Sequence, residues 1–187
     1  MDLVSHNRKM ARNNRWSNDR LYRAVLALQP GEFEAARTSF FPSIRETLNH
    51  MLAVDLLYLG FLEESRVGAA AYDDFAGYDD PAKLAEAQAA ADWRLIAFCD
   101  GLSESDPDRR VVTDRRENGM IPERIADLLA HLFLHEIHHR GQVHAMLSGT
   151  TVAPPQLDEF LLDYDLHLRR EEVERLGLGD SGRSKQP

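Results

Sequence analysis

Residues 122–148 constrain the fold more than any other stretch of the chain, because apolar side chains recur there at the three- and four-residue spacing of an α-helix. Each residue of an α-helix turns by about 100° around the axis, and the other apolar members of this pattern then fall within about 60° of the direction of Ile125. These members are Leu128, Leu129, Leu132, Val143, Met146 and Leu147. The segment is therefore predicted to be a long helix with one face in the core.

Two histidines of this segment, His135 and His139, are four residues apart. On a helix their side chains lie about 40° apart around the axis, with His139 inside the apolar arc and His135 at its edge. The neighbouring histidines 131, 138 and 144 fall outside the arc. A pair with this spacing favours a shared metal ion over the alternative, two hydrogen-bonded core histidines.

A stable metal site needs at least a third protein ligand. His50 lies in a second predicted helix, residues 43–64, where it shares a face with Val54, Leu57 and Phe61. This stripe is expected to point His50 into the protein core. It could be a hydrogen-bonded core residue, but beside a histidine pair it is the best candidate for the third ligand.

The spacing of apolar residues along the rest of the chain predicts an all-α fold, a four-helix bundle with a long crossover. One domain is expected over residues 1–176, followed by a disordered tail over 177–187. Further helices are predicted at 10–28 and 82–102, with a short one at 157–168. The loop 66–81, rich in Gly, Asp and Pro, is long enough to cross the end of a bundle.

A short hairpin is predicted just before the last long helix. The segments 111–113 and 117–121 would together form this hairpin, with a turn at Asn118–Gly119. Pro122 is expected to open the following helix, since proline is favoured in the first helical turn.

Composition excludes several classes of protein. No apolar run reaches the roughly 18 residues of a membrane helix, and the first 16 residues lack the apolar region of a secretory signal. A net charge of −9 argues against nucleic acid or an anionic membrane as partner. The single cysteine, Cys99, fits the reducing cytoplasm, and it is expected to pack as a small hydrophobic residue.

Glu136 completes an H-E-x-x-H sequence, which is typical of zinc proteases. The extension found in one large protease group is missing, because Gly141 and His144 stand two and five residues after His139 instead of three and six. A zinc hydrolase using Glu159 as an acidic ligand stays as an alternative. Glu136 itself is predicted to be buried.

The role of Glu136 is open between two interpretations. It could act as a base or supporting group beside the metal, which makes it the candidate catalytic residue. It could equally form an ion pair with an arginine of another helix, such as Arg45 or Arg94. Its neighbours Arg140 and Gly141 are expected to be structural, Arg140 pairing with an acid on the first or second helix and Gly141 allowing close helix packing.

Three motifs together resemble the DinB-like family of metal-dependent proteins. They are Asn-Arg-Trp-Ser-Asn at 14–18, Leu-Asn-His-Met-Leu-Ala-Val-Asp at 48–55 and the histidine-rich stretch at 131–143. The resemblance implies a four-helix bundle with a long crossover, often a homodimer. It also implies a divalent metal, nickel or zinc, held by His50, His135 and His139. Glu136 departs from the smaller or neutral residue expected there.

The same resemblance implies a small-molecule substrate. Some relatives are thiol-dependent S-transferases or isomerases that use low-molecular-weight thiols such as bacillithiol or mycothiol. In such an enzyme the metal lowers the pKa of the thiol, so that thiolate forms at neutral pH. A non-catalytic metal-stabilised bundle or regulatory protein is the alternative.

Overall fold

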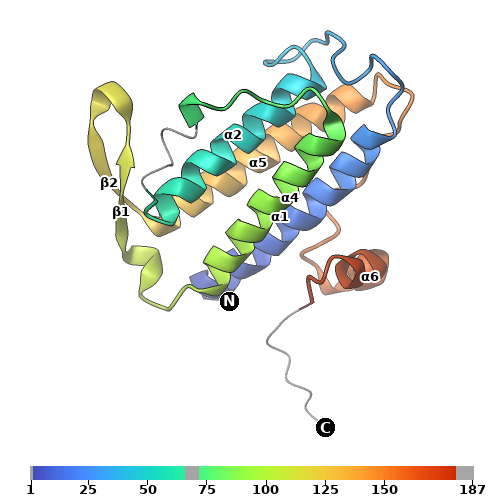
Figure 1. Ribbon diagram of the computed structural model, residues 1–187. Helices are drawn as coiled ribbons and strands as arrows, with labels where there is room; N and C mark the ends of the chain where they lie inside the picture. Colours follow the sequence, from blue (N-terminus) through green and yellow to red (C-terminus); the bar gives the residue numbers. More distant parts are fainter. Residues whose placement is uncertain (1, 66–71, 180–187) are drawn as a thin grey trace.

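The computed structural model describes residues 2–65 and 72–179 of the chain and shows a bundle of four long helices. These are α1 (Leu3–Leu26), α2 (Ile44–Leu62), α4 (Pro81–Asp100) and α5 (Ile125–Leu147). α1 and α2 each pack against both α4 and α5 (Figure 1). The expected all-α fold class is confirmed.

The long crossover connects α2 to α4. Both helices run in the same direction (Figure 1), so the chain must return along the bundle between them. An ion pair of 2.7 Å between Glu63, just after α2, and Arg94, in the last turns of α4, joins matching ends of the two helices. Residues 66–71 of the expected loop lie outside the described residues.

α1 begins at Leu3, earlier than the predicted start near residue 10. The Asp2 side chain caps the helix, accepting a 2.8 Å hydrogen bond from the backbone N–H of Ser5. Val4 and Ala11 are buried and extend the apolar face toward the N-terminus. At the same end, Arg8 donates to the carbonyls of Cys99, Asp100 and Leu102, which ties α1 to the end of α4.

The predicted hairpin is present, formed by β1 (Arg110–Asp114) and β2 (Met120–Arg124). Its connection is longer than a two-residue turn and contains a 3-10 turn, Arg116–Asn118, before Gly119 at a φ of +78°. Pro122 does not open the helix as predicted. It lies in β2 opposite Val112, where the missing N–H is tolerated because a two-stranded sheet consists of edge strands.

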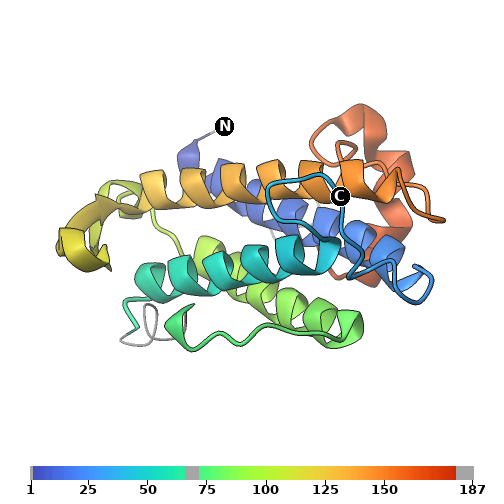
Figure 2. The same ribbon diagram turned by 90° about the horizontal axis from the view of Figure 1, so that it is seen from above.

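The short helix predicted at 157–168 is wrong in its position, because α6 spans Leu166–Arg175. Buried Arg169 donates to the carbonyls of Glu159 and Leu162, at 3.1 and 2.8 Å, and so satisfies backbone groups that a helix would otherwise pair. Phe160 packs on Trp16 with ring centroids 5.6 Å apart. The hairpin and α6 lie toward opposite ends of the bundle (Figure 2).

The expected disordered tail began at residue 177. Leu178 is buried in the core, with 4% of its surface exposed, beside the likewise buried Leu176. Residues 180–187 lie outside the described residues. Leu178 therefore packs against the bundle, and the expectation for the rest of the tail stays a prediction.

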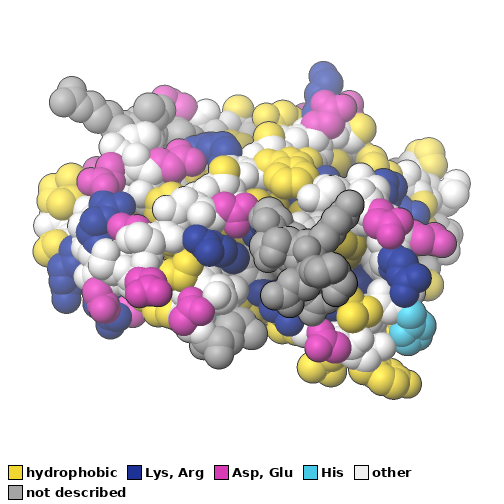
Figure 3. Space-filling view, turned by 90° about the horizontal axis from the view of Figure 1, so that it is seen from below, with side chains coloured by type: hydrophobic (Ala, Val, Ile, Leu, Met, Phe, Trp, Pro, Cys, Tyr) yellow, Lys and Arg dark blue, Asp and Glu magenta, His cyan; other side chains and the backbone are white. Residues whose placement is uncertain are grey.

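Basic and acidic side chains are interspersed on the face shown in Figure 3. Among the described residues drawn there, the positive side chains form no continuous surface of the kind that follows a phosphate backbone. Across the described chain, none of the helices combines the length and the apolar character that crossing a membrane requires.

Candidate metal centre

α2 places His50 two turns into the helix. Ser43 caps α2 by accepting a 3.1 Å hydrogen bond from the backbone N–H of Glu46, which sets the start of the helix. Leu48, Met51 and Leu52 are fully buried around His50. The rigid packing of these neighbours holds the His50 imidazole at the inner edge of the helix, facing α5.

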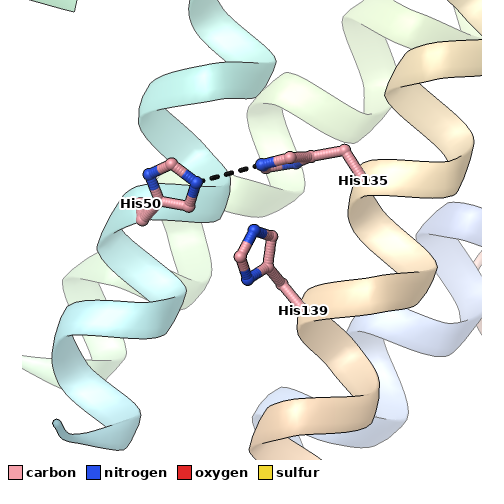
Figure 4. Close-up of side chains that lie close together, drawn as sticks. All are labelled: His50, His135 and His139. Carbon is pink, nitrogen blue, oxygen red and sulfur yellow. Dashed lines mark hydrogen bonds between the residues drawn. The ribbon is translucent and has the colours of Figure 1, made fainter. Parts of the chain in front are cut away.

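α5 supplies His135 and His139, whose rings point toward His50 (Figure 4). The Nε2 atoms of His50 and His135 are 3.0 Å apart. The ring of His139 lies 4.7 Å from that of His50 and 4.4 Å from that of His135, between centroids. One ligand nitrogen from each residue lies within 4.8 Å of the others, so the structure brings together the three residues singled out from the sequence.

These separations fit a bound divalent cation. Nitrogen ligands lie about 2.0–2.1 Å from zinc, which puts two of them about 3.3 Å apart in a tetrahedral site. Among the described residues, the Nδ1 atom of His135 is buried without a hydrogen-bond partner. A cluster of this shape, built only from imidazoles, could hold a metal ion.

All three imidazoles favour the neutral form that a metal requires. Burial lowers the pKa of His50 to about 4, with the charge of His139 adding to the effect. Burial and the neighbouring histidines lower the pKa of His135 to about 3. The pKa of His139 is also lowered by burial, against a hydrogen bond to Gln142 that raises it. The lone pairs are therefore available at neutral pH.

Two further residues belong to the centre, and sequence reasoning did not single out either of them. Gln142 places its Oε1 2.7 Å from Nδ1 of His139. Phe41 packs on the cluster, with its ring 4.4 Å from that of His50 and 5.8 Å from that of His139. The position of Gln142 one turn after His138 was a usable signal. Phe41 lies in an irregular segment whose path only the tertiary structure defines.

The sequence matches the DinB family over residues 3–170. The chain belongs to the DinB family. Its fold is similar to the crystal structure of a DinB-like protein, YjoA, from Bacillus subtilis, with a TM-score of 0.54 and 19% identity. That similarity covers 82% of this chain and 96% of YjoA. A search of curated proteins finds no match.

Glu136 of this DinB-family protein is fully buried, as predicted, but neither predicted arginine is its partner. Arg45 pairs with Asp79 and Arg94 with Glu63. The partner of Glu136 is Arg140, one turn along the same helix, at 3.3 Å. Arg140 is the partner because residues four apart on a helix are neighbours before any tertiary contact forms.

Glu136 and Arg140 belong to a buried polar network that joins α5 to α1. Asn18 donates to Glu136 at 3.3 Å and accepts from Arg140 at 3.0 Å. Arg140 also donates to the side-chain oxygen of Asn14. The prediction that Arg140 pairs with an acid of the first or second helix is wrong, because α1 offers it amide oxygens instead. Amides satisfy a buried guanidinium without adding a second buried charge.

The network continues through α4 to α2. Asp92 accepts hydrogen bonds from Asn14 at 3.1 Å and Asn18 at 2.9 Å, and Gln88 donates to Asp55 at 2.5 Å. Burial raises the pKa of Asp92 to about 7, with the charge of Glu136 acting in the same direction. The sequence did not reveal this network, because its members are spread over four helices and each alone looks like an ordinary polar residue.

Gly141 does not serve close helix packing as predicted. A Cβ atom built at this position would meet no heavy atom within 4 Å. Gly141 instead borders a cavity of about 480 Å³, together with Met10, Ile137 and Leu161. Cys99 agrees with expectation: it is fully buried, and burial raises its thiol pKa to about 12.

Proposed function

We propose that this DinB-family protein is a divalent-metal-dependent enzyme that acts on a small molecule with the help of a low-molecular-weight thiol. The observation that supports this is the cluster of His50, His135 and His139. Among the described residues, no fourth His, Cys, Asp or Glu joins them. Three protein ligands with a further position open is the arrangement of catalytic rather than structural metal sites.

Nickel or zinc is the proposed metal, since imidazole suits both ions. Bound at the three histidines, such an ion would supply Lewis-acid chemistry and lower the pKa of a thiol placed beside it. The protein's own contribution is to keep the imidazoles neutral by burial and to orient His139 through Gln142. Phe41 packs against the ring of His50 on one side of the cluster.

The thiol must come from outside the chain. Cys99 is the single cysteine, and it is buried between helices with a raised pKa, so it cannot act as the nucleophile. A free low-molecular-weight thiol, such as bacillithiol or mycothiol, meets the requirement.

Space for a substrate exists beside the cluster. A cavity of about 430 Å³ shares Phe41 with the histidine centre and is lined by Arg45, Asn49 and Tyr78. Its polar walls suit a small molecule with hydrogen-bonding groups.

A zinc hydrolase is the weaker alternative. In that reaction Glu136 would act as the base beside the metal, but its Oε2 atom is engaged with Asn18 and Arg140 and its Oε1 atom is fully buried. We therefore assign Glu136 to the network that supports α5 rather than to the chemistry.

The metal assignment is tested by three substitutions, His50→Ala, His135→Ala and His139→Ala. Each should remove most of the bound nickel or zinc from the purified protein, measured by elemental analysis. His6→Ala and His144→Ala are the matched controls, since both lie outside the cluster, and they should keep the wild-type metal content. Stoichiometric metal in all three cluster variants would show that the site lies elsewhere.

Thiol binding to the cobalt-substituted wild-type protein distinguishes a catalytic centre from a non-catalytic, metal-stabilised bundle. With cobalt in place of the native metal, bacillithiol or mycothiol should add a sulfur-to-metal absorption band if a coordination position is open. A closed structural site would give no band, and chelation would then lower the thermal stability of the bundle sharply.

We further propose that the chain forms a homodimer. The proposal rests on the family resemblance, and Leu134, Ile137 and Leu162 are apolar side chains that are 48–67% exposed and so available to an interface. Light scattering on the purified protein measures the mass directly, and a monomer at micromolar concentration would contradict the proposal.

A further inference from the structure

A second cavity lies between α1 and α4, the two helices that supply none of the three histidines. Its volume is about 280 Å³. Residues of α1 and of the first half of α4 line it. The polar ones that matter here are Arg15, Tyr22, Gln88 and Asp92.

Three of these lining residues are more than nine-tenths buried and still keep a polar atom without a partner. They are Asp92, Gln88 and Tyr22, with 1%, 0% and 4% of their surface exposed. Oδ2 of Asp92, Oε1 of Gln88 and the Tyr22 hydroxyl have no hydrogen-bond partner among the described residues. A buried polar atom left in this state destabilises the fold, so a group from outside is expected to meet these atoms.

Among the described residues no donor lies within hydrogen-bond distance of these oxygen atoms, although the Nε atom of Arg15 is itself buried without a partner. The other oxygen of Asp92, Oδ1, already accepts from Asn14, Asn18 and Gln88. Oδ2 has only the Nη1 atom of Arg15, at 3.9 Å, which is too long for a hydrogen bond. The side chain of Asp19, which also lines the cavity, forms an ion pair with Arg175.

We propose that this cavity binds the ammonium group of a small primary amine. Such a group carries three N–H donors, which matches the three unpartnered oxygen atoms, whereas one water molecule has two. Its positive charge meets the buried Asp92 carboxylate and the carboxylate of Glu86 at the rim, against the guanidinium of Arg15, while Asp19 is already paired with Arg175.

The apolar part of the amine also has a place. Ala82, Ala85 and Ala89 recur along one side of α4 and line the cavity with methyl groups. Small side chains at this spacing leave room for a short alkyl chain next to the ammonium group. The amine site is separate from the histidine cluster, because none of its lining residues belongs to that cluster in the described structure.

Calorimetric titration of the full chain with ethylammonium chloride tests the proposal. Tetramethylammonium chloride at equal concentration is the control ligand, because it has the same charge and no N–H donor. We expect saturable one-to-one binding of ethylammonium alone. Absence of heat at roughly 50 mM ethylammonium, far above a weak millimolar affinity, would overturn the proposal and leave water as the occupant.

Two variants locate the site. Asp92→Asn removes the charge and should weaken ethylammonium binding at least roughly tenfold. Ala89→Leu fills the cavity without touching the buried network and should weaken binding to the same degree, so the test survives even if Asp92→Asn fails to fold. Ala90→Leu, at the exposed neighbouring position, is the matched control. Equal affinity in Ala89→Leu and Ala90→Leu would place the amine elsewhere and overturn the proposal.

Discussion

The Oε1 atom of Gln142 lies 2.7 Å from Nδ1 of His139. An amide oxygen only accepts, so this contact assigns the ring proton to Nδ1 and leaves Nε2 with a free lone pair. The amide nitrogen of Gln142 is fixed in turn, 3.1 Å from Nε2 of His138. Gln142 therefore selects the tautomer of His139 and orients its ring toward the cluster.

Replacing Gln142 by Leu should weaken metal binding by roughly 10- to 100-fold, the usual loss when a hydrogen-bond partner of a metal-binding histidine is removed. Competition with a chromogenic chelator measures the affinity. Gln29→Leu, the same change at an exposed loop position, is the control and should bind metal as the wild type does. An unchanged affinity in Gln142→Leu would mean that His139 needs no such partner.

Gly141→Ala should stabilise the protein by roughly 0.5–1 kcal/mol. Glycine within a helix is unfavourable relative to alanine, and here an added methyl group meets nothing within 4 Å. Gly77→Ala is the contrasting change, since Gly77 has a φ of +75° and its Cβ would lie 3.0 Å from Asn49. Urea unfolding should show opposite signs for the two variants, and destabilisation by Gly141→Ala would contradict the open environment.

Arg140→Met should destabilise the fold by roughly 3–5 kcal/mol, because it leaves the Glu136 charge buried without its partner. The double variant Glu136→Met with Arg140→Met should recover a large part of this loss. Arg94→Met breaks an exposed pair with Glu63 and should cost under about 1 kcal/mol. Similar losses for Arg94→Met and Arg140→Met in urea unfolding would refute the distinction between the two pairs.

The contribution of Asp92 to stability should depend on pH. Its pKa rises from the usual 3.8 to about 7 in the folded protein, so the folded state holds the proton more tightly. The resulting stability is fully present below about pH 4 and is lost as the pH rises through 7, at up to about 1.4 kcal/mol per pH unit.

Asp92→Asn removes this dependence. The free energy of unfolding of the wild type, minus that of the variant, should therefore fall between pH 4 and pH 7 and stay level above pH 8. Urea unfolding at several pH values measures it. A difference that rises with pH would mean that Asp92 is stabilised as the carboxylate.

Much of the site was predictable from local pattern. His135 and His139 share a helix face because helical geometry places residues four apart side by side, and the stripe of Val54, Leu57 and Phe61 set the direction of His50. The motifs also identified the family. The same reasoning predicted the hairpin, but it placed Pro122 at a helix start, since proline suits both a first helical turn and an edge strand.

The sequence by itself determined the long helices, the burial of Glu136 and the faces that carry the three histidines, because these depend on periodicity within one segment. Only the tertiary structure decided which distant groups meet. It brought Asn18 and Arg140, 122 positions apart, into one buried network, and it carried Phe41 onto His50. Such contacts depend on how four helices pack, and a polar side chain in the sequence does not show which neighbour will satisfy it.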